Sequence, residues 1–322
     1  MKKRVLDLTG QALVEGVMIK HNGDYSMALR KGNNDIEIVR DVYKGIMGRG
    51  PFKKIPVLRG IFALIDNMIL MIKLFLFSSD YHEDNGNEEP QRFQKISKKL
   101  TGKYHESVEL TIFITLTLAI SVLGFVVLPY YISGKIADKF IPNFTMMTLI
   151  EVCIRLIMLV IYIGMFCLNK DIRRICSYHG AQHKTINCLR KGNELTIKNV
   201  RRCSKYDSEC EFNFVFYVVF ISIILFSFVR NNDMWVRMGI RVLIIPVVAA
   251  ILYEVMQVTK NMTGMIGNVF QLPQKLLQNI IVKEPSEDMI EVAIESVEDV
   301  FDWREYLRKE FGYGEETAEE EE

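Results

Sequence analysis

Long apolar blocks separated by charged segments dominate the pattern of this chain. Four such blocks are residues 108–132, 144–168, 213–229 and 236–259. A helix rises about 1.5 Å per residue, so about 20 apolar residues cross a hydrocarbon core of about 30 Å. The pattern therefore predicts an α-helical multi-pass membrane protein built on a bundle of four spans. The third block is near the short limit for a span.

A fifth apolar segment, residues 57–77, carries a regular set of charges. Arg59, Asp66 and Lys73 recur at every seventh residue, which places them on one narrow stripe of a helix. Basic residues flank the segment on both sides. These features favour a helix that lies in the cytoplasmic membrane interface, or re-enters it. A fifth span is the alternative interpretation.

The polar ends of the chain predict smaller folded elements. Residues 25–30 and 36–40 flank a turn-rich stretch, which is typical of a β-hairpin within a small β-rich unit. Residues 269–282 and 287–310 are amphipathic helix candidates, the second with Ser286 as its expected N-cap. The predicted segments are a β-rich unit 1–54, the interfacial helix 55–78, a polar linker 79–107, spans 108–132 and 144–168, a cytoplasmic loop 169–212, spans 213–229 and 236–259, amphipathic helices 260–310 and an acidic tail 311–322.

Lysine and arginine are distributed unevenly among the connections between the predicted spans. Residues 169–212 carry ten of them, residues 133–143 carry two and residues 230–235 carry one. Connections rich in Lys and Arg stay in the cytoplasm. We therefore expect the long loop and both termini on the cytoplasmic side of a bacterial cell membrane. The net charge of +1 provides no field for nucleic acid, so the lipid bilayer is the expected partner and other membrane proteins are candidates.

The predicted cytoplasmic loop contains the strongest chemical signal of the sequence. His179 and His183 are four residues apart, so a helix presents both imidazoles on one face, where they could share a divalent metal. Further along, Cys203, Asp207 and Cys210 share a face if their stretch is helical. A set of His179, His183, Asp207 and Cys210 would suit zinc or a related ion. The alternative interpretation is a hydrogen-bonded histidine pair without a metal.

The same stretch departs from a hydrolase pattern at one position. The pattern H-x-x-E-H marks inverted zinc peptidases, in which the glutamate activates the metal-bound water. Gln182 stands at that position, and an amide does not act as a general base at neutral pH. Either another carboxylate takes this role or the site does not hydrolyse anything. Glu15 and Glu254 are the carboxylates that we consider for it.

Three charged residues fall inside the predicted spans. Glu151 and Arg155 are four residues apart in the second span, and Arg241 lies at a similar depth in the fourth. Because charges are costly in hydrocarbon, they usually pair within the bundle. The sequence therefore predicts an ion pair that fixes helix packing, with a polar cavity or path as the alternative.

Several stretches together resemble a bacterial membrane family of the YqhQ type. They are GQALVEGVM at 10–18, PVLRG at 56–60, DIRR at 171–174 and HGAQHKTI at 179–186. The resemblance covers about residues 5–305 and implies the same multi-pass architecture. Members of the family are often labelled predicted metal-dependent enzymes, although no reaction is established for them.

The chain departs from that family pattern in its candidate site. The family usually has glutamate where Gln182 stands, and a His-Pro-Arg-Cys-Gly-Thr stretch where residues 207–212 read DSECEF. Only Cys210 matches in the second stretch, so Asp207 is at best a substitute ligand. The resemblance thus implies His179, His183 and Cys210 as site residues.

Two functions from different classes remain after these observations. The first is a metal-dependent membrane enzyme with its site at the cytoplasmic face. The second is a non-catalytic scaffold or biogenesis factor for other membrane proteins, which Gln182 favours chemically. A transporter is less consistent with four spans that show no repeat. The sequence indicates neither a substrate nor an oligomeric state.

Overall fold

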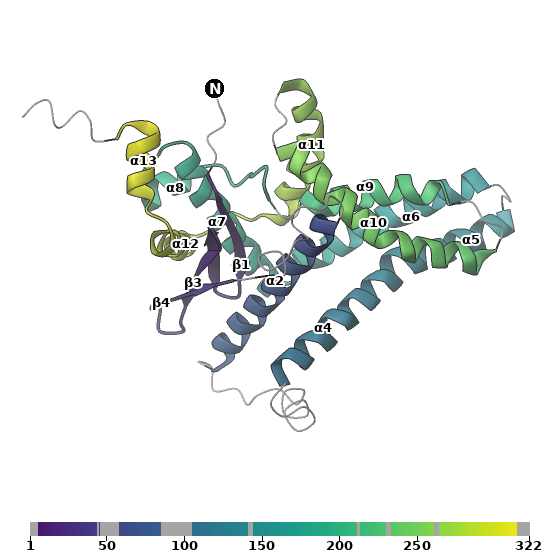
Figure 1. Ribbon diagram of the computed structural model, residues 1–322, viewed down its shortest axis with the longest axis horizontal. Coiled ribbons are helices and arrows are strands. Elements are labelled where there is room, and N and C mark those ends of the chain that lie inside the picture. Colours follow the sequence, from purple (N-terminus) through teal and green to yellow (C-terminus); the bar gives the residue numbers. More distant parts are fainter. Residues whose placement is uncertain are drawn as a thin grey trace, which may run out of the picture.

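The structure, a computed structural model, has a sheet-centred unit at one end and a layer of long helices at the other (Figure 1). The four strands of the sheet come from the first 43 residues, and the described helices follow from residue 58 onward. The residues that the structure describes are 6–43, 45, 58–84, 105–140, 144–210, 213–229, 233–260 and 264–313.

The sheet is a four-stranded antiparallel meander in the order β1-β2-β3-β4. Short turns join its strands, and Gly23 between β2 and β3 has a φ of 102°, a conformation that favours glycine. The β3–β4 hairpin lies where the sequence predicts one, and the small N-terminal β-rich unit is confirmed. The strands are β1 (Leu8–Leu13), β2 (Gly16–His21), β3 (Asp24–Arg30) and β4 (Ile36–Val42).

One face of the sheet is covered by helices from the middle and the end of the chain. Leu8, Val17 and Ala28 of the strands share one hydrophobic core with Tyr178 of α7 and Val292 of α12. Three segments far apart in the sequence therefore fold as one unit. The helices are α7 (Lys170–Arg190), α8 (Ile197–Arg202), α12 (Glu287–Val300) and α13 (Trp303–Phe311).

The other face of the sheet packs against α2 (Leu58–Asp84). Leu70 and Leu74 of this helix join a second core with Tyr25 and Leu29 of β3. Ser78 accepts a hydrogen bond of 3.2 Å from the backbone N–H of Val14. The C-terminal half of α2 thus lies along the sheet, while the helix as a whole also packs against α10.

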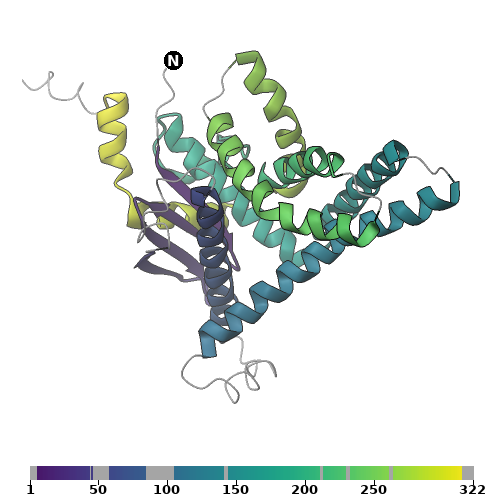
Figure 2. The ribbon, with the colours of Figure 1, turned by 45° about the vertical axis from the view of Figure 1, so that its right-hand side comes forward.

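The helical layer extends away from the sheet (Figures 1 and 2). Within it α5 packs against α6 and α9 packs against α10, and both pairs are consecutive along the chain. A π-helical segment, η3, interrupts the long helix between α4 and α5. The elements are α4 (His105–Val122), η3 (Leu123–Val127), α5 (Leu128–Phe140), α6 (Phe144–Leu168), α9 (Asn213–Ser227), α10 (Met234–Lys260) and α11 (Gly264–Ile281).

Within the described part of the chain, four helices are long and apolar enough to cross a membrane: 59–79, 115–136, 146–165 and 235–256. Three of them overlap the predicted spans 108–132, 144–168 and 236–259. The fourth is α2, whose three charges on one stripe still leave an apolar window. The predicted span at 213–229 is instead a shorter apolar helix, because α9 covers only residues 213–227.

The segments between and after the spans differ from the sequence-based expectation in three places. The predicted loop 169–212 contains α7, a regular helix of 21 residues. Residues 203–210 are not helical, so Cys203, Asp207 and Cys210 do not share a helical face. The predicted helix 287–310 is divided, because Asp302 caps α13 through the N–H of Glu305, at 2.9 Å.

Candidate metal centre

The helix α7 carries two of the three residues of the centre, and the sequence marks where this helix begins. Asn169 caps the helix by accepting hydrogen bonds from the N–H groups of Asp171 and Ile172, at 2.8 and 3.2 Å. His179 and His183 lie one turn apart on this helix, with their ring centroids separated by 4.2 Å. Both side chains are buried beneath neighbouring segments, so the helix presents the two imidazoles to the protein interior.

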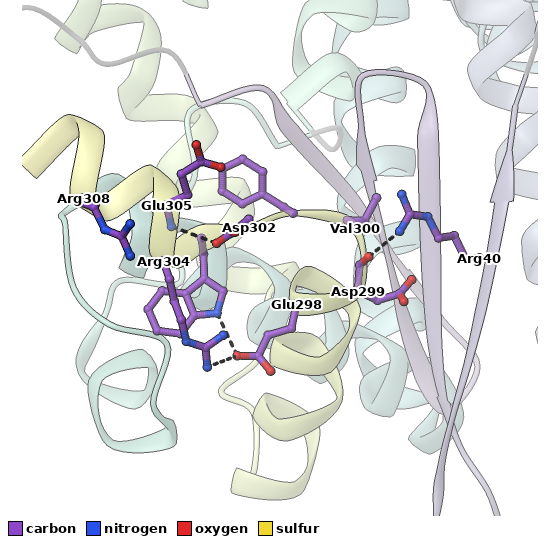
Figure 3. A pocket seen from close by; sticks show the side chains of 10 residues that line it. Arg40, Glu298, Asp299, Val300, Asp302, Arg304, Glu305 and Arg308 are labelled. Atoms are coloured by element: carbon purple, nitrogen blue, oxygen red, sulfur yellow. Dashed lines mark hydrogen bonds and ion pairs between the residues drawn. The ribbon is translucent and has the colours of Figure 1, made fainter. Parts of the chain in front are cut away.

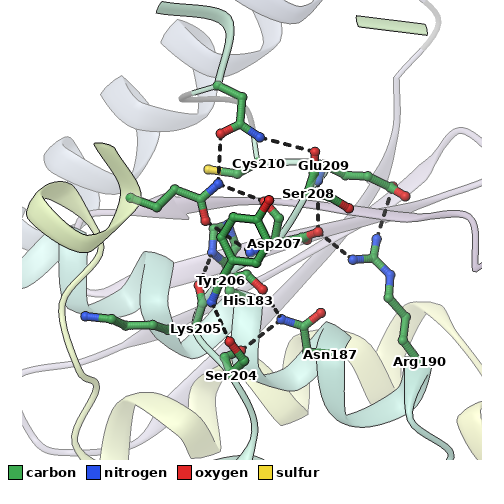
Figure 4. Close-up of polar contacts among 12 residues, drawn as sticks. His183, Asn187, Arg190, Ser204, Lys205, Tyr206, Asp207, Ser208, Glu209 and Cys210 are labelled. Atoms are coloured by element: carbon green, nitrogen blue, oxygen red, sulfur yellow. Dashed lines mark hydrogen bonds and ion pairs between the residues drawn. The ribbon is translucent and has the colours of Figure 1, made fainter. Parts of the chain in front are cut away.

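Cys210 is the third member of the cluster and arrives from the segment that follows α8. Its Sγ lies 3.3 Å from Nε2 of His179. One nitrogen from each histidine and the Cys210 sulfur all lie within 4.8 Å of one another. Asn187 of α7 secures the segment by donating to the backbone carbonyls of Ser204 and Tyr206, each at 2.8 Å (Figure 4).

The protonation of His183 is fixed by its surroundings. Its Nδ1 donates to the Lys205 carbonyl oxygen at 2.7 Å, so its Nε2 carries the lone pair. That Nε2 is buried and has no hydrogen-bond partner among the described residues. A backbone carbonyl that orients a histidine in this way is typical of metal-binding sites. Buried polar atoms without a partner are rare, and an ion would provide one.

Burial also keeps both imidazoles neutral. It lowers the pKa of His179 well below its usual value, and the neighbouring His183 lowers it further. Burial likewise lowers the pKa of His183, despite the opposing effect of Asp207. A neutral imidazole is the form that binds a metal. The two histidines are therefore prepared as ligands across the neutral pH range.

The donor set fits a zinc-like ion. Tetrahedral zinc takes imidazole nitrogens at about 2.0–2.1 Å and thiolate sulfur at about 2.3 Å, which separates the donors by about 3.3–3.8 Å. The distance between His179 and Cys210 already falls in that range. A nitrogen and sulfur set favours zinc over magnesium or calcium. Three protein donors leave a fourth position for one further ligand.

Asp207, predicted as the fourth ligand, has other partners in the structure. Its Oδ1 accepts from Arg190 at 2.6 Å and from the N–H of Glu209 at 2.9 Å. Burial raises the pKa of Asp207, but Arg190 and His183 outweigh it and hold the pKa below its usual value. Asp207 therefore contributes a charge beside His183, whereas His179, His183 and Cys210 form the cluster.

The three residues considered for catalysis lie in different surroundings. Gln182 is buried between the two histidines in sequence and packs against Gly10 of β1, and its Oε1 has no hydrogen-bond partner among the described residues. Glu15, at the turn between β1 and β2, forms an ion pair with Arg174. Glu254 of α10 forms a bidentate ion pair with Arg59 of α2, with hydrogen bonds of 2.8 and 2.6 Å.

Two groups that position the centre were not predicted. The Lys205 carbonyl orients His183, and Gln278 of α11 bonds both to the Asp207 backbone and to Asn213. No sequence pattern marks a single backbone carbonyl. Gln278 does leave a signal, because Gln274 and Gln278 recur four residues apart inside an apolar helix. Cys203 lies buried beside Cys188 and is not a member of the cluster.

A second polar cluster lies inside the helical layer, where the sequence predicts an ion pair. One oxygen of Glu151 accepts from Arg155 at 2.6 Å and from Arg241 at 2.5 Å. The guanidinium of Arg241 also lies over the Tyr130 ring, 4.3 Å from its centroid, and Arg155 lies 4.7 Å from the Phe226 centroid. The cluster joins α5, α6, α9 and α10.

A hollow at the junction of α12 and α13 carries charges of both signs (Figure 3). Glu298 accepts from the Trp303 indole at 2.8 Å and pairs with Arg304 at 3.2 Å. Arg40 of β4 donates to the Asp299 carbonyl at 2.9 Å. Among the residues that line the hollow, Glu298 and Arg304 form an ion pair, and neither histidine nor cysteine is present.

Gly180, between His179 and Ala181, is expected to tolerate no side chain. A Cβ at this position would overlap the backbone carbonyl oxygen of Lys283. We expect Gly180→Ala to lower stability by about 1–3 kcal/mol, the usual cost of overpacking, as measured by thermal unfolding in detergent. Gly164→Ala in α6 is the matched control, since nothing lies within 4 Å of its added Cβ. Equal stability of the two variants would contradict the close packing of α7.

Fold and site together define a helical protein with candidate membrane spans and a buried His/His/Cys cluster in its sheet-centred unit. The sequence belongs to the DUF1385 family, described as "Protein of unknown function", whose profile matches residues 55–303. It is also 31% identical over 288 residues to the "Uncharacterized protein YqhQ" of Bacillus subtilis (strain 168), a match that covers 89% of this chain and 90% of the relative. No solved structure matches the chain significantly.

Proposed function

We propose that this protein is a non-catalytic membrane scaffold whose cytoplasmic unit is stabilised by a zinc-like ion at His179, His183 and Cys210. The carrying observation is the closed character of the centre. All three ligand side chains are buried, and they join α7 to the segment after α8. Four protein ligands are usual at structural zinc sites and three at catalytic ones, so the number of donors does not carry the proposal. Burial does, because a catalytic ion must be reached by water and substrate, and these three side chains are closed off from solvent. When bound, the ion supplies the cross-link between these two segments.

The carboxylates support a non-catalytic role. Water activation requires a general base within hydrogen-bond reach of the water. Glu15 and Glu254 are both held in ion pairs with arginines, and Asp207 is held by Arg190. Gln182, which faces the strand β1, does not accept a proton at neutral pH. Within the described ranges, the cluster contains histidine and cysteine but no carboxylate.

A metal-dependent membrane enzyme is the second candidate. It is favoured by one observation, that the cluster consists of three donors and leaves a fourth metal position. In that case the fourth ligand would be a water or a substrate atom. The two candidates differ in what they require of Gln182.

Substitution of Gln182 separates the two functions. We expect Gln182→Ala to complement a deletion strain as wild type does, because a scaffold needs no base here, while His179→Ala/His183→Ala fails to complement it. Gln182→Glu is expected to retain metal, and any hydrolytic activity that it gains would mark the site as a modified hydrolase centre. The measurement is growth or membrane-protein profile of the complemented strain. Failure of Gln182→Ala with metal still bound would contradict the scaffold and favour the enzyme.

The proposed topology places the sheet-centred unit in the cytoplasm. The sheet, α7 and α12 share one core, so the chain must return to the same side of the membrane before α7 and again before α12. An even number of crossings satisfies this condition if α4–α5 pairs with α6 and α9 pairs with α10. A crossing by α2 in addition to those by α4–α5 and α6 would give an odd number of crossings between the sheet and α7. Its packing along the sheet supports a position in the interface instead.

The short α9 fits this topology only as the partner of α10. Its 15 residues measure about 22 Å, which is less than the hydrocarbon core of about 30 Å. A helix this short spans by local thinning of the bilayer or with adjoining residues. The abundance of Lys and Arg in residues 169–212 supports a cytoplasmic position for the unit, in the cell membrane of a bacterium.

Labelling of engineered cysteines on intact cells tests this topology. We expect a membrane-impermeant maleimide to reach Lys135→Cys, which lies in α5 near the end of the apolar stretch 115–136, but not Glu194→Cys after α7. The two exposed side chains would lie on opposite sides of the membrane. Permeabilised cells should label at both positions, which controls for reactivity. Labelling of Glu194→Cys in intact cells would reverse the proposed orientation.

A further inference from the structure

The helix α11 exposes apolar side chains and buries two glutamines, which is the reverse of what is expected of a helix surrounded by water. Two of its polar residues, Gln274 and Gln278, are only 4% and 2% exposed. Its apolar residues Leu272, Leu276 and Ile280 are 61%, 60% and 49% exposed. The three exposed residues recur at intervals of four, so they form one stripe on the face opposite the two glutamines. Water would favour the reverse arrangement.

The position of α11 suits the plane of a membrane interface. In Figure 1 it runs across the direction of α9 and α10, at the end of the helical layer near the sheet. It packs against α6 and α9, whose own exposed side chains are apolar, among them Phe214 and Phe220. The stripe on α11 is therefore apolar, like the neighbouring helix surface that the bilayer would cover. Lys275 is exposed beside it and lies 5.0 Å from the Tyr206 ring.

The buried face of α11 holds the segment that carries Cys210. Gln278 accepts from the Asp207 N–H at 3.1 Å and donates to the Asp207 carbonyl at 2.8 Å. It also donates to Asn213 at 2.8 Å. Asn213 in turn donates to the Ser208 carbonyl at 3.2 Å, and its N–H to the Cys210 carbonyl at 3.1 Å. Gln274 bonds instead to the hydroxyl of Tyr217 in α9.

We propose that α11 lies in the lipid interface with Leu272, Leu276 and Ile280 among the acyl chains, and that Gln278 is a positioning residue for Cys210. Lipid is the occupant that fits the stripe, because a cationic residue beside an apolar stripe is typical of interfacial helices. An anionic phospholipid bilayer provides acyl chains for the apolar stripe and negatively charged headgroups for Lys275. The second half of the proposal rests on the proposed metal centre, while the first half is independent of it.

Photo-crosslinking tests the lipid contact. In the full-length protein, Leu276 is replaced by p-benzoylphenylalanine in membranes that contain phosphatidylglycerol, and irradiation is followed by mass spectrometry. We expect a phospholipid adduct at this position. The matched control is the same replacement at Ile38 of β4, which is 40% exposed but lies in the sheet. A protein adduct at Leu276, or no lipid adduct there, would overturn the interfacial position of α11.

Cobalt binding to the purified protein tests the positioning role. Cobalt in a cysteine-containing site gives a thiolate-to-metal charge-transfer band in the near ultraviolet and d–d bands in the visible, and loss of an outer-shell partner typically weakens metal binding by about 10–100-fold. We expect a loss of this size for Gln278→Ala. Gln278→Glu, which keeps only the acceptor for the Asp207 N–H, should lose less. Asn279→Ala, at the exposed neighbouring position, should bind as wild type does.

A control on the same face separates positioning from stability. Gln274→Ala removes the bond to Tyr217 without touching the Asp207 segment, so it should lower the unfolding temperature and leave the cobalt affinity unchanged. Equal affinity of Gln278→Ala and wild type would overturn the positioning role. Absence of cobalt binding in wild type would instead contradict the proposed metal centre, and the lipid adduct at Leu276 would still stand.

Discussion

Glu151→Ala is expected to prevent normal accumulation of the protein in the membrane. The side chains of Glu151, Arg155 and Arg241 are only 4%, 7% and 2% exposed, and one carboxylate oxygen accepts from both arginines. Removing the carboxylate leaves two cations without a counter-charge in a region of low dielectric. Removing one partner of a buried pair costs about 3–5 kcal/mol, which is a large part of the stability of most domains.

The measurement is the amount of full-length protein in isolated membranes, together with its unfolding temperature in detergent. Replacing all three charges, in Glu151→Gln/Arg155→Met/Arg241→Met, should restore much of the loss, because an apolar substitute for a buried charge cluster is often neutral. Glu305→Ala is the matched control, since Glu305 and Lys309 form an exposed pair with the same four-residue spacing. Normal accumulation of Glu151→Ala would mean that water reaches the cluster.

Removal of metal is expected to destabilise the wild-type protein and to leave His179→Ala/His183→Ala unaffected. An ion that binds only the folded state adds about 2.7 kcal/mol at a concentration one hundred times its dissociation constant. The ion would join α7 to the segment of Cys210, in addition to the contacts that Asn187 and Arg190 of α7 make with that segment. Losing that cross-link should first loosen residues 203–210.

Thermal unfolding with and without a chelator measures this effect. The histidine variant has its own lower stability, so the informative quantity is the change that the chelator produces within each protein. Cys153→Ala controls for general thiol effects, because Cys153 is exposed on α6 and far from the centre in sequence. An equal response of all three proteins to the chelator would show that the histidines do not hold the ion.

The sequence predicts local elements well where a short period is involved. The β3–β4 hairpin and the apolar helices follow from periods of two residues and from long uninterrupted apolar runs. The histidine pair follows from a four-residue spacing in one helix. His179, His183 and Cys210 were all considered from the sequence, and the structure brings these three together.

What the sequence does not predict is the contacts between distant segments. Asp207 and Cys210 lie only three residues apart in sequence, but Arg190 holds the Asp207 carboxylate while Cys210 joins the histidines. This difference depends on how the segment folds back on α7. The role of α2 raises the same problem. Its composition suits a span, while Leu70 and Leu74 pack on the sheet, and no local pattern reveals that a distant sheet will cover one face of a helix.

The metal content of the purified full-length protein tests the central claim most directly. The protein is extracted without chelators, exposed to zinc, passed over a desalting column and analysed by inductively coupled plasma mass spectrometry. We predict about one zinc ion per chain for wild type and for Cys153→Ala, and almost none for His179→Ala/His183→Ala or Cys210→Ala. Wild-type protein that holds no metal after this treatment, or variants that hold as much as wild type, would contradict the account.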